Sequence, residues 1–165
     1  MKNHRALNTP ADFITEEFYN MYLQIKKLDD NADVPERKTS GAAGMDLTAC
    51  ISSPLTIGPG SREAVKTGIA MAVPEHFACF IYARSGLAVK HGITLSNCVG
   101  VIDSDYRGEI TVGLINESSE PYVIQPHERI AQAVISPVEA PVINVVDELP
   151  PTARGDGGFG STGKI

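Results

Sequence analysis

From Tyr22 onward, apolar and polar residues alternate in short runs separated by turn residues. A period of two, typical of a half-buried strand, is seen in Leu23-Gln24-Ile25-Lys26. Breaks such as Ser53-Pro54 and Gly58-Pro59-Gly60 mark turns. The strands expected on this basis are 22–28, 46–50, 55–57, 62–73, 77–83, 93–102, 109–116, 121–125, 129–137 and 142–146. Many short, closely spaced strands predict an all-β fold, either a barrel or a jelly-roll-like sandwich.

The pattern divides the chain into an N-terminal extension over 1–21, a β-barrel domain over 22–150 and a C-terminal tail over 151–165. In the extension, Thr9-Pro10-Ala11-Asp12 has the residues of a helix start, but a frayed extension without a role fits equally well. One short helix is predicted over Ser85–His91, before Gly92. The tail has five glycines within 154–163. It cannot pack a core by itself and is expected to be mobile until it orders on something else.

Composition agrees with a β protein and narrows the function. Val and Ile number 28 against 9 Leu, which favours pleated strands over a helical bundle. A net charge of −6 argues against a protein that wraps nucleic acid, and no apolar run reaches the roughly 20 residues that cross a membrane. The three cysteines and four histidines form no CxxC or HxxH pair. We therefore expect reduced, buried cysteines, no zinc site and a cytoplasmic protein.

Three polar segments interrupt the predicted strands. Asp46 follows a run of small residues that permits close approach of the backbone. Arg84-Ser85-Gly86, at a strand end before a possible helix, suits an anion. The segment from Asn97 to Gly108 is predicted to be a β-hairpin in which Asp103, at the end of an apolar run, is partly desolvated and suited to act as a general base.

Two neighbours of Asp103 are open to more than one interpretation. Asp105 completes a DxD pattern that can bind a metal, but a turn residue bonded to its own backbone is favoured. Tyr106 either stacks on a ligand or packs as an ordinary strand residue. In the tail, Arg154, Ser161, Thr162 and glycine-freed backbone N–H groups suit a phosphate chain, while Phe159 offers a face for a base. A flexible terminus without function is the alternative.

Taken in order, five segments resemble the five motifs of the trimeric deoxyuridine triphosphatases. They are Ala43-Gly44-Met45-Asp46-Leu47, Arg84-Ser85-Gly86-Leu87-Ala88, Asn97 through Gly108, Glu128-Arg129-Ile130-Ala131-Gln132, and Arg154 through Gly163. The resemblance covers residues 22–165. It departs from the family pattern at His127, where glycine is common, and at Ala153, where a charged residue is frequent. Residues 1–20 are an addition that it does not explain.

The resemblance implies a jelly-roll homotrimer with shared active sites that hydrolyses dUTP to dUMP and pyrophosphate. Asp103 is then the base that activates water for attack on the α-phosphorus. The residues implied to contact uracil are Asn97, Gly100, Val101 and Ile102, with Thr111 lining the same pocket. Tyr106 is implied to lie against the deoxyribose and to exclude a 2′-hydroxyl.

The phosphates are implied to be bound from a neighbouring subunit by Arg84, Ser85, Gly86 and Gln132. A third subunit's tail is implied to contribute Arg154, Gly160 and Ser161, with Phe159 over the uracil. Mg²⁺ is implied to be held by the triphosphate and waters without a direct protein ligand, Asp46 reaching it only through water. Two alternatives remain: a dCTP deaminase-like enzyme, and a regulatory protein that senses a nucleotide on the same fold.

Overall fold

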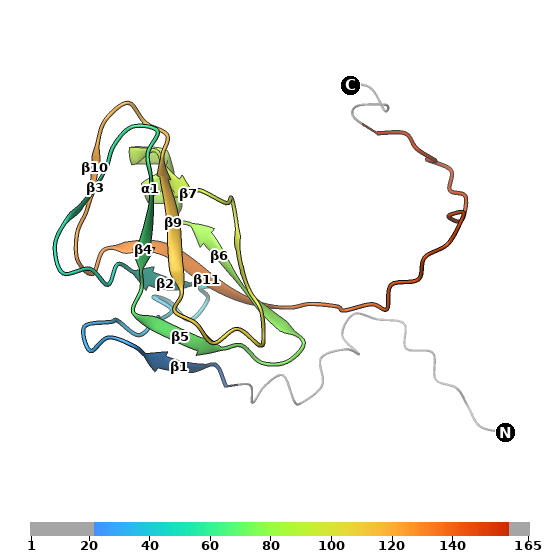
Figure 1. The fold of residues 1–165 in the computed structure, drawn as a ribbon, viewed down its shortest axis with the longest axis horizontal. Helices are drawn as coiled ribbons and strands as arrows, with labels where there is room; N and C mark the ends of the chain where they lie inside the picture. Colours follow the sequence, from blue (N-terminus) through green and yellow to red (C-terminus); the bar gives the residue numbers. More distant parts are fainter. Residues whose placement is uncertain (1–21, 159–165) are drawn as a thin grey trace.

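The computed structural model describes residues 22–158 and shows an all-β body with one short helix (Figure 1). The strands are β1 (Gln24–Lys27), β2 (Met45–Thr48), β3 (Leu55–Ile57), β4 (Arg62–Lys66), β5 (Ile69–Ala72), β6 (Phe77–Ala83), β7 (Ile93–Leu95), β8 (Gly100–Ile102), β9 (Thr111–Asn116), β10 (Tyr122–Ile124) and β11 (Arg129–Pro137). Helix α1 spans Ser85–His91. The predicted all-β fold class is confirmed, and so is the short helix predicted over Ser85–His91.

Two antiparallel sheets form the two layers of the body. One has the strand order β2-β11-β6-β8 and the other β4-β9-β7, while β1-β5 and β10-β3 form two-stranded ribbons. A single core cluster joins the layers: Leu47, Ile81 and Ala133 face inward from the first, and Val65, Val112, Leu114 and Ile93 from the second. The arrangement is a jelly-roll-like sandwich rather than a closed barrel. Each large aliphatic side chain in this core stabilises the fold by about 1.5–3 kcal/mol.

Strand β9 shows how the alternating pattern builds the core. Val112, Leu114 and Asn116 point inward, and only Asn116 is polar. Its side chain is fully buried, and its Nδ2 donates to the carbonyls of Ile57 (2.9 Å) and Glu120 (2.7 Å). Its Oδ1 accepts from the backbone N–H and the hydroxyl of Ser118. Asn116 therefore ties β9 to the end of β3 and to the loop that follows β9, with every polar atom of its side chain satisfied.

Two predicted strands are each divided by a turn. Gly68, at φ 68°, separates β4 from β5 within the predicted strand 62–73, because a left-handed residue ends the pleat. The predicted strand 93–102 is divided by a turn at Asn97–Val99, where Cys98 has φ 63°. Helix α1 ends as predicted at Gly92, whose left-handed backbone lets its N–H donate to Ala88.

The predicted strand 142–146 is wrong for the single chain. After β11 the chain leaves the body and runs to Gly158 without regular structure (Figure 1). Val142, Ile143 and Val145 are 95%, 89% and 91% exposed. Proline at 137 and 141 interrupts the N–H ladder that would continue β11, so this apolar alternation has no strand to pair with in its own chain.

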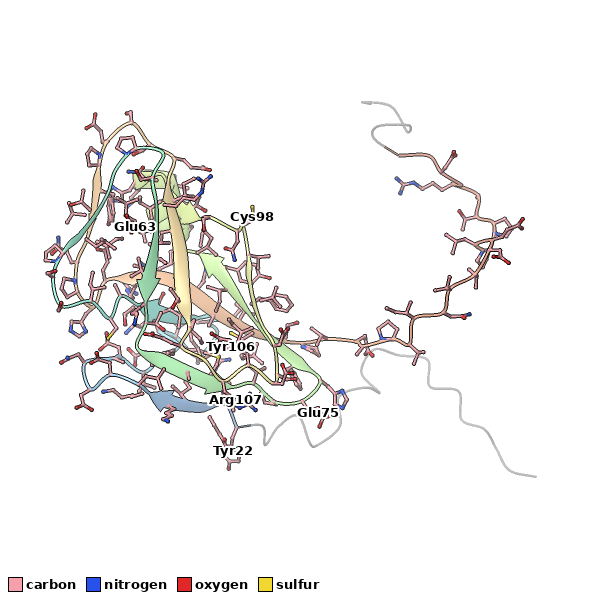
Figure 2. All side chains as sticks on the ribbon, in the orientation of Figure 1. Tyr22, Glu63, Glu75, Cys98, Tyr106 and Arg107 are labelled. Atoms are coloured by element: carbon pink, nitrogen blue, oxygen red, sulfur yellow. The ribbon has the colours of Figure 1, made fainter. Side chains whose placement is uncertain are left out.

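The cysteines differ from expectation in one respect. Cys79 is buried and Cys50 half-buried, but Cys98 is exposed at the turn between β7 and β8, at the periphery of the body (Figure 2). Burial raises the pKa of the Cys79 thiol to about 11, so that thiol stays protonated. No helix within residues 22–158 is long and apolar enough to span a membrane. The candidate helix after Thr9, together with Phe159, Gly160 and Ser161, lies outside the described residues.

Candidate active site

A small hollow of about 130 Å³ opens between β6, β8 and β9. Its lining consists of Ile81, Leu95, Asn97, Gly100, Val101, Ile102, Thr111, Val112 and Gly113. All five residues predicted to surround a pyrimidine ring are therefore brought together here. Among the strands of residues 22–158, β8 is an edge strand: one side of its backbone pairs with β6, and the N–H and C=O groups of its other side face no strand.

Two glycines allow strands to approach closely around this hollow. A Cβ on Gly100 would lie 3.0 Å from the Cβ of Ile81, its partner across β6. A Cβ on Gly113 would lie 2.6 Å from the hydroxyl of Ser96. A side chain at Gly100 would require Ile81 to shift by a few tenths of an ångström, and one at Gly113 would require the Ser96 hydroxyl to move.

Asp103 follows β8 directly and begins a tight turn. The N–H of Tyr106 donates to the carbonyl of Asp103 at 3.2 Å, and Arg107 donates to the carbonyls of Ser104 and Tyr106 at 2.7 and 2.8 Å. Tyr106 and Arg107 lie at the end of the body near β5 (Figure 2). Asp103 itself is exposed, which corrects the expectation that it is partly desolvated in the single chain. Within residues 22–158 its carboxylate forms no hydrogen bond or ion pair, so it is free to accept a proton.

Asp105 lies within the same turn and is exposed. In the part of the chain that the structure describes, no three His, Cys, Asp or Glu side chains gather in a way that would hold a metal ion.

A second cluster joins the first, second and fourth of the resembling segments. Asp46 on β2 receives Arg84 Nε at Oδ1 (3.1 Å) and Arg129 Nη1 at Oδ2 (3.0 Å). Arg84 Nη1 also donates to the carbonyl of Arg129 at 2.9 Å. The Asp46 side chain is 17% exposed, so solvent screens these pairs less than it screens surface pairs. Two guanidinium groups on one carboxylate leave a net positive charge, which favours an anion.

Gln132 belongs to the same cluster. It lies opposite Asp46 in the β2–β11 register, and its Nε2 donates to the carbonyl of Ala83, at the end of β6. Ser85 and Gly86 form the exposed first turn of α1, directly after Arg84. The structure thus gathers Asp46, Arg84, Ser85, Gly86 and Gln132. Arg129 was missed by the sequence reasoning, since an arginine in an alternating strand is most simply interpreted as a solvated residue.

The hollow and the cationic cluster are separate within one chain. Ile81 lines the hollow, and Arg84 lies three residues further along the chain, just past the end of β6, which is about 10 Å at the usual strand rise. Arg154, the described part of the predicted phosphate-binding tail, reaches neither, because the segment after β11 runs away from the body (Figure 1). Its Nε instead donates to the carbonyl of Gly157 at 2.7 Å.

His127 departs from the resemblance and has a structural explanation. It has φ 61°, a left-handed conformation that glycine adopts at no steric cost. Its Nδ1 lies 3.0 Å from Oδ2 of Asp33, which also accepts the Thr48 hydroxyl at 2.8 Å. Partial burial acts to raise the pKa of the Asp33 carboxyl. The two hydrogen bonds and the charge of His127 lower it by more, so the pKa of Asp33 lies below its ordinary value. Next to it, Glu128 accepts from Tyr122 Oη and Gln125 N–H, so Glu128 holds the turn between β10 and β11.

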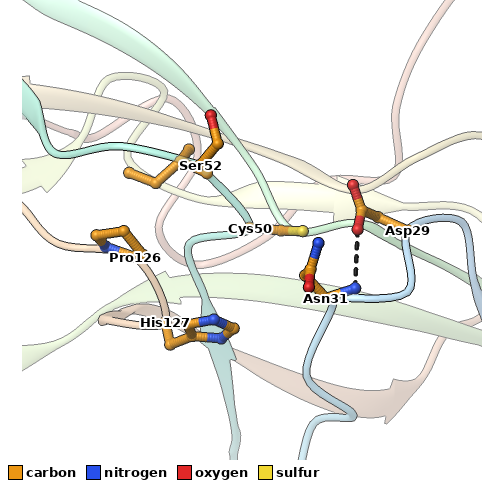
Figure 3. A pocket seen from close by; sticks show the side chains of 7 residues that line it. Asp29, Asn31, Cys50, Ser52, Pro126 and His127 are labelled. Carbon is orange, nitrogen blue, oxygen red and sulfur yellow. Dashed lines mark hydrogen bonds between the residues drawn. The ribbon is translucent and has the colours of Figure 1, made fainter.

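His127 also lines a hollow of about 330 Å³ that contains none of the predicted site residues (Figure 3). Its other lining residues are Asp29, Asn31, Cys50, Ile51, Ser52 and Pro126. Burial and the nearby carboxylates of Asp29, Glu109 and Asp33 raise the pKa of the Cys50 thiol, which keeps it protonated and a poor nucleophile. This hollow offers no chemistry comparable to the turn at Asp103.

Comparison with known proteins shows the family to which the chain is similar. The family model described as dUTPase matches residues 30–163. The deoxyuridine 5′-triphosphate nucleotidohydrolase of Idiomarina loihiensis is 48% identical over 147 residues, covering 86% of this chain and 97% of that protein. The protein of the same name from Albidiferax ferrireducens is 52% identical over 132 residues, covering 79% and 89%.

Solved structures agree with the sequence relatives. A mutant dUTPase of Staphylococcus bacteriophage 80alpha with bound dUpNHpp has a TM-score of 0.79 and 28% identity, covering 86% of this chain and 98% of that one. A mutant dUTPase of phage phi11 of S. aureus, described with a structural Mg(II) ion, has a TM-score of 0.71 and 25% identity, covering 78% and 98%.

Proposed function

Because the chain belongs to the dUTPase family, and so is a dUTP diphosphatase that hydrolyses dUTP to dUMP, we propose that the hollow between β6, β8 and β9 holds the uracil ring and that Asp103 activates the attacking water. The hollow carries this proposal, because it gathers Asn97, Gly100, Val101, Ile102 and Thr111. Asp103 follows Ile102 directly and so lies at the edge of the hollow. Uracil presents two carbonyl acceptors and one N–H donor along its edge. The unpaired backbone groups of β8 and the Asn97 amide are complementary to that edge.

The narrowness of the hollow supports discrimination among bases. Even a Cβ added to Gly100 would lie only 3.0 Å from the Cβ of Ile81, so the walls leave little room for the 5-methyl group of thymine. Cytosine has an exocyclic amine where uracil presents a carbonyl acceptor. That amine would face a backbone N–H, so that both of these donors would lack an acceptor. A site built to satisfy one hydrogen-bonding pattern rejects its alternatives strongly.

In the proposed reaction, Asp103 accepts a proton from a water molecule as the water oxygen bonds to the α-phosphorus. The bond from that phosphorus to the oxygen bridging the α- and β-phosphates breaks, and pyrophosphate leaves with the electron pair. The carboxylate can serve because no other described group occupies it. Tyr106, three residues further along the same turn, would lie against the deoxyribose and leave no room for a 2′-hydroxyl.

The cationic cluster is proposed to bind the phosphates. Asp46 and the Arg129 carbonyl occupy Nε and Nη1 of Arg84 and so leave its Nη2 for a phosphate oxygen. Ser85, Gly86 and Gln132 lie beside it. The cluster alone favours an anion, but a hydrated Mg²⁺ carried by the triphosphate would fit beside it, since each Asp46 oxygen accepts one guanidinium and keeps a lone pair for a water on the ion. Bound to the triphosphate, the ion would neutralise its charge.

We propose a homotrimer with shared sites because the chain exposes two apolar surfaces. Across the outer face of the four-stranded sheet, Val134 pairs with Phe80 and Phe80 with Val101, and Tyr82 and Val101 are 42% and 54% exposed. The segment after β11 exposes Val142, Ile143 and Val145 as well. Neighbouring copies would cover both surfaces. The hollow of one copy would then receive the cationic cluster of a second copy and the tail of a third. The tail would contribute Arg154, Phe159, Gly160 and Ser161.

The test is incubation of the purified protein with Mg²⁺ and each nucleotide in turn. We expect pyrophosphate release from dUTP and far less from dCTP, dTTP or UTP. Ammonia release from dCTP would support the deaminase alternative instead. Tight binding of dUTP without pyrophosphate release would support the regulatory one. Native mass measurement on the same sample tests the trimer.

A further inference from the structure

Glu109 lies just beyond the third resembling segment, yet its backbone holds the tyrosine that this segment carries. The hydroxyl of Tyr106 donates to the carbonyl of Glu109 at 3.1 Å. The ring folds back over Gly108 so closely that a Cβ there would lie 2.4 Å from the tyrosine oxygen. The place of the ring is therefore set by the peptide that follows Gly108.

The Glu109 side chain fastens this peptide to a different part of the fold. Oε1 accepts the N–H of Gly68 at 3.0 Å, and Oε2 lies 3.3 Å from Lys66 Nζ. Gly68 is buried in the turn between β4 and β5, and its carbonyl accepts the N–H groups of Leu28 and Asp29. A Cβ on Gly68 would lie 2.7 Å from Ala32 and Cys50, so this turn is packed tightly. Glu109 thus docks Tyr106 on a rigid support.

We propose that Glu109 is a positioning residue for sugar selection, an inference that rests on the proposed function in which Tyr106 lies against the deoxyribose. The carboxylate on Gly68 fixes the backbone of Glu109, and the carbonyl of Glu109 fixes the Tyr106 ring. A 2′-hydroxyl is excluded only while the ring keeps its place. The same peptide has a second anchor, since the N–H of Ile110 donates to the Ile69 carbonyl at 2.9 Å. Loss of the carboxylate therefore loosens the ring without releasing it.

Three variants separate the two contacts of the carboxylate. Glu109→Ala removes both, Glu109→Gln keeps an acceptor for the Gly68 N–H, and Lys66→Ala removes only the ion pair, in which the lysine is 69% exposed. The measurement is kcat/KM for dUTP divided by kcat/KM for UTP. We expect Glu109→Ala to lower this ratio by about tenfold, less than the roughly 10²-fold cost of a full 1 Å misplacement. Glu109→Gln and Lys66→Ala should stay within about twofold of wild type.

A thermal melt of each variant separates positioning from stability. A purely structural role would lower Tm and total activity in Glu109→Ala but leave the dUTP-to-UTP ratio at its wild-type value, and that result overturns the inference. If Glu109→Ala does not fold, Glu109→Asp replaces it, because a carboxylate one methylene shorter cannot reach Gly68 and should lower the ratio in the same way.

Tyr106→Ala serves as the reference for the ring itself. A ratio lowered by Tyr106→Ala but unchanged by Glu109→Ala overturns this inference alone. A wild-type protein that turns over dUTP and UTP equally overturns the proposed sugar contact, and the inference with it.

Discussion

Nε of Arg84 lies 3.1 Å from Oδ1 of Asp46, and this ion pair joins the strand β2 to the junction between β6 and α1. Both side chains are mostly buried, at 26% and 17% exposure, so water does not compete freely for either. The pair fixes the direction of the guanidinium group before any ligand arrives. Electrostatic groups held in advance in this way need no reorganisation when charge develops on the substrate.

Replacing Asp46 tests this arrangement. Asp46→Asn keeps the size of the side chain but removes the charge that holds Arg84 and Arg129. We expect kcat/KM for dUTP to fall by about tenfold, which corresponds to the lower part of the 1–3 kcal/mol cost of losing a buried partner. Asp33→Asn is the matched control, since its carboxylate contacts Thr48 and His127 and not the arginines. Equal effects of the two substitutions would contradict the positioning of Arg84 by Asp46.

A methyl group tests the hollow. Gly100→Ala places a Cβ 3.0 Å from the Cβ of Ile81, so this wall of the hollow must shift by a few tenths of an ångström. We expect KM for dUTP to rise by about tenfold, since a single misplaced methylene is worth 10-fold or more in a fitted pocket. Gly41→Ala, where an added Cβ meets nothing within 4 Å, should leave KM unchanged. An unaltered KM in Gly100→Ala would mean that the uracil ring binds outside this hollow.

The buried amide of Asn116 tests the fold. Asn116→Ala leaves the carbonyls of Ile57 and Glu120 without its Nδ2 donor, and should lower the free energy of unfolding by about 1–3 kcal/mol. Urea denaturation measures this change. Asn31→Ala, at an exposed position outside the proposed interface, is the control and should change stability by less than about 0.5 kcal/mol. A similar small effect at both positions would mean that water satisfies the freed carbonyls.

The sequence predicted what depends on local periodicity and missed what depends on distant contacts. Alternation over β9 and β11 correctly indicated strands, because both bury one face against the opposite sheet. The segment 142–146 has the same alternation but no partner strand within its own chain, and periodicity carries no information about a partner. The resembling motifs led to Asn97 and Asp103. Arg129 lies within the fourth motif, but its contact with Asp46 is formed across the fold and could not be predicted from the pattern. Glu109 lies outside the motifs, and its role arises from its contact with Gly68.

Mixed assemblies test whether the tail crosses between subunits. A chain ending at Pro151 should still fold and assemble, since the last described strand ends at Pro137. Its activity should collapse, because Arg154, Phe159 and Ser161 are proposed to act once the triphosphate is in place. Co-assembly with full-length Asp103→Asn should restore part of the activity, as an intact base then meets an intact tail. Verified mixed trimers as inactive as both parents would contradict the crossing.

The role of Asp103 as the base is tested most directly by single-turnover hydrolysis of dUTP by Asp103→Asn, together with binding of the non-hydrolysable dUpNHpp. The asparagine keeps the shape of the turn and removes the proton acceptor. The chemical step should slow by roughly 10²-fold or more, the usual contribution of a positioned base, while dUpNHpp binds within about twofold of wild type. Hydrolysis at the wild-type rate would show that water is activated by another group.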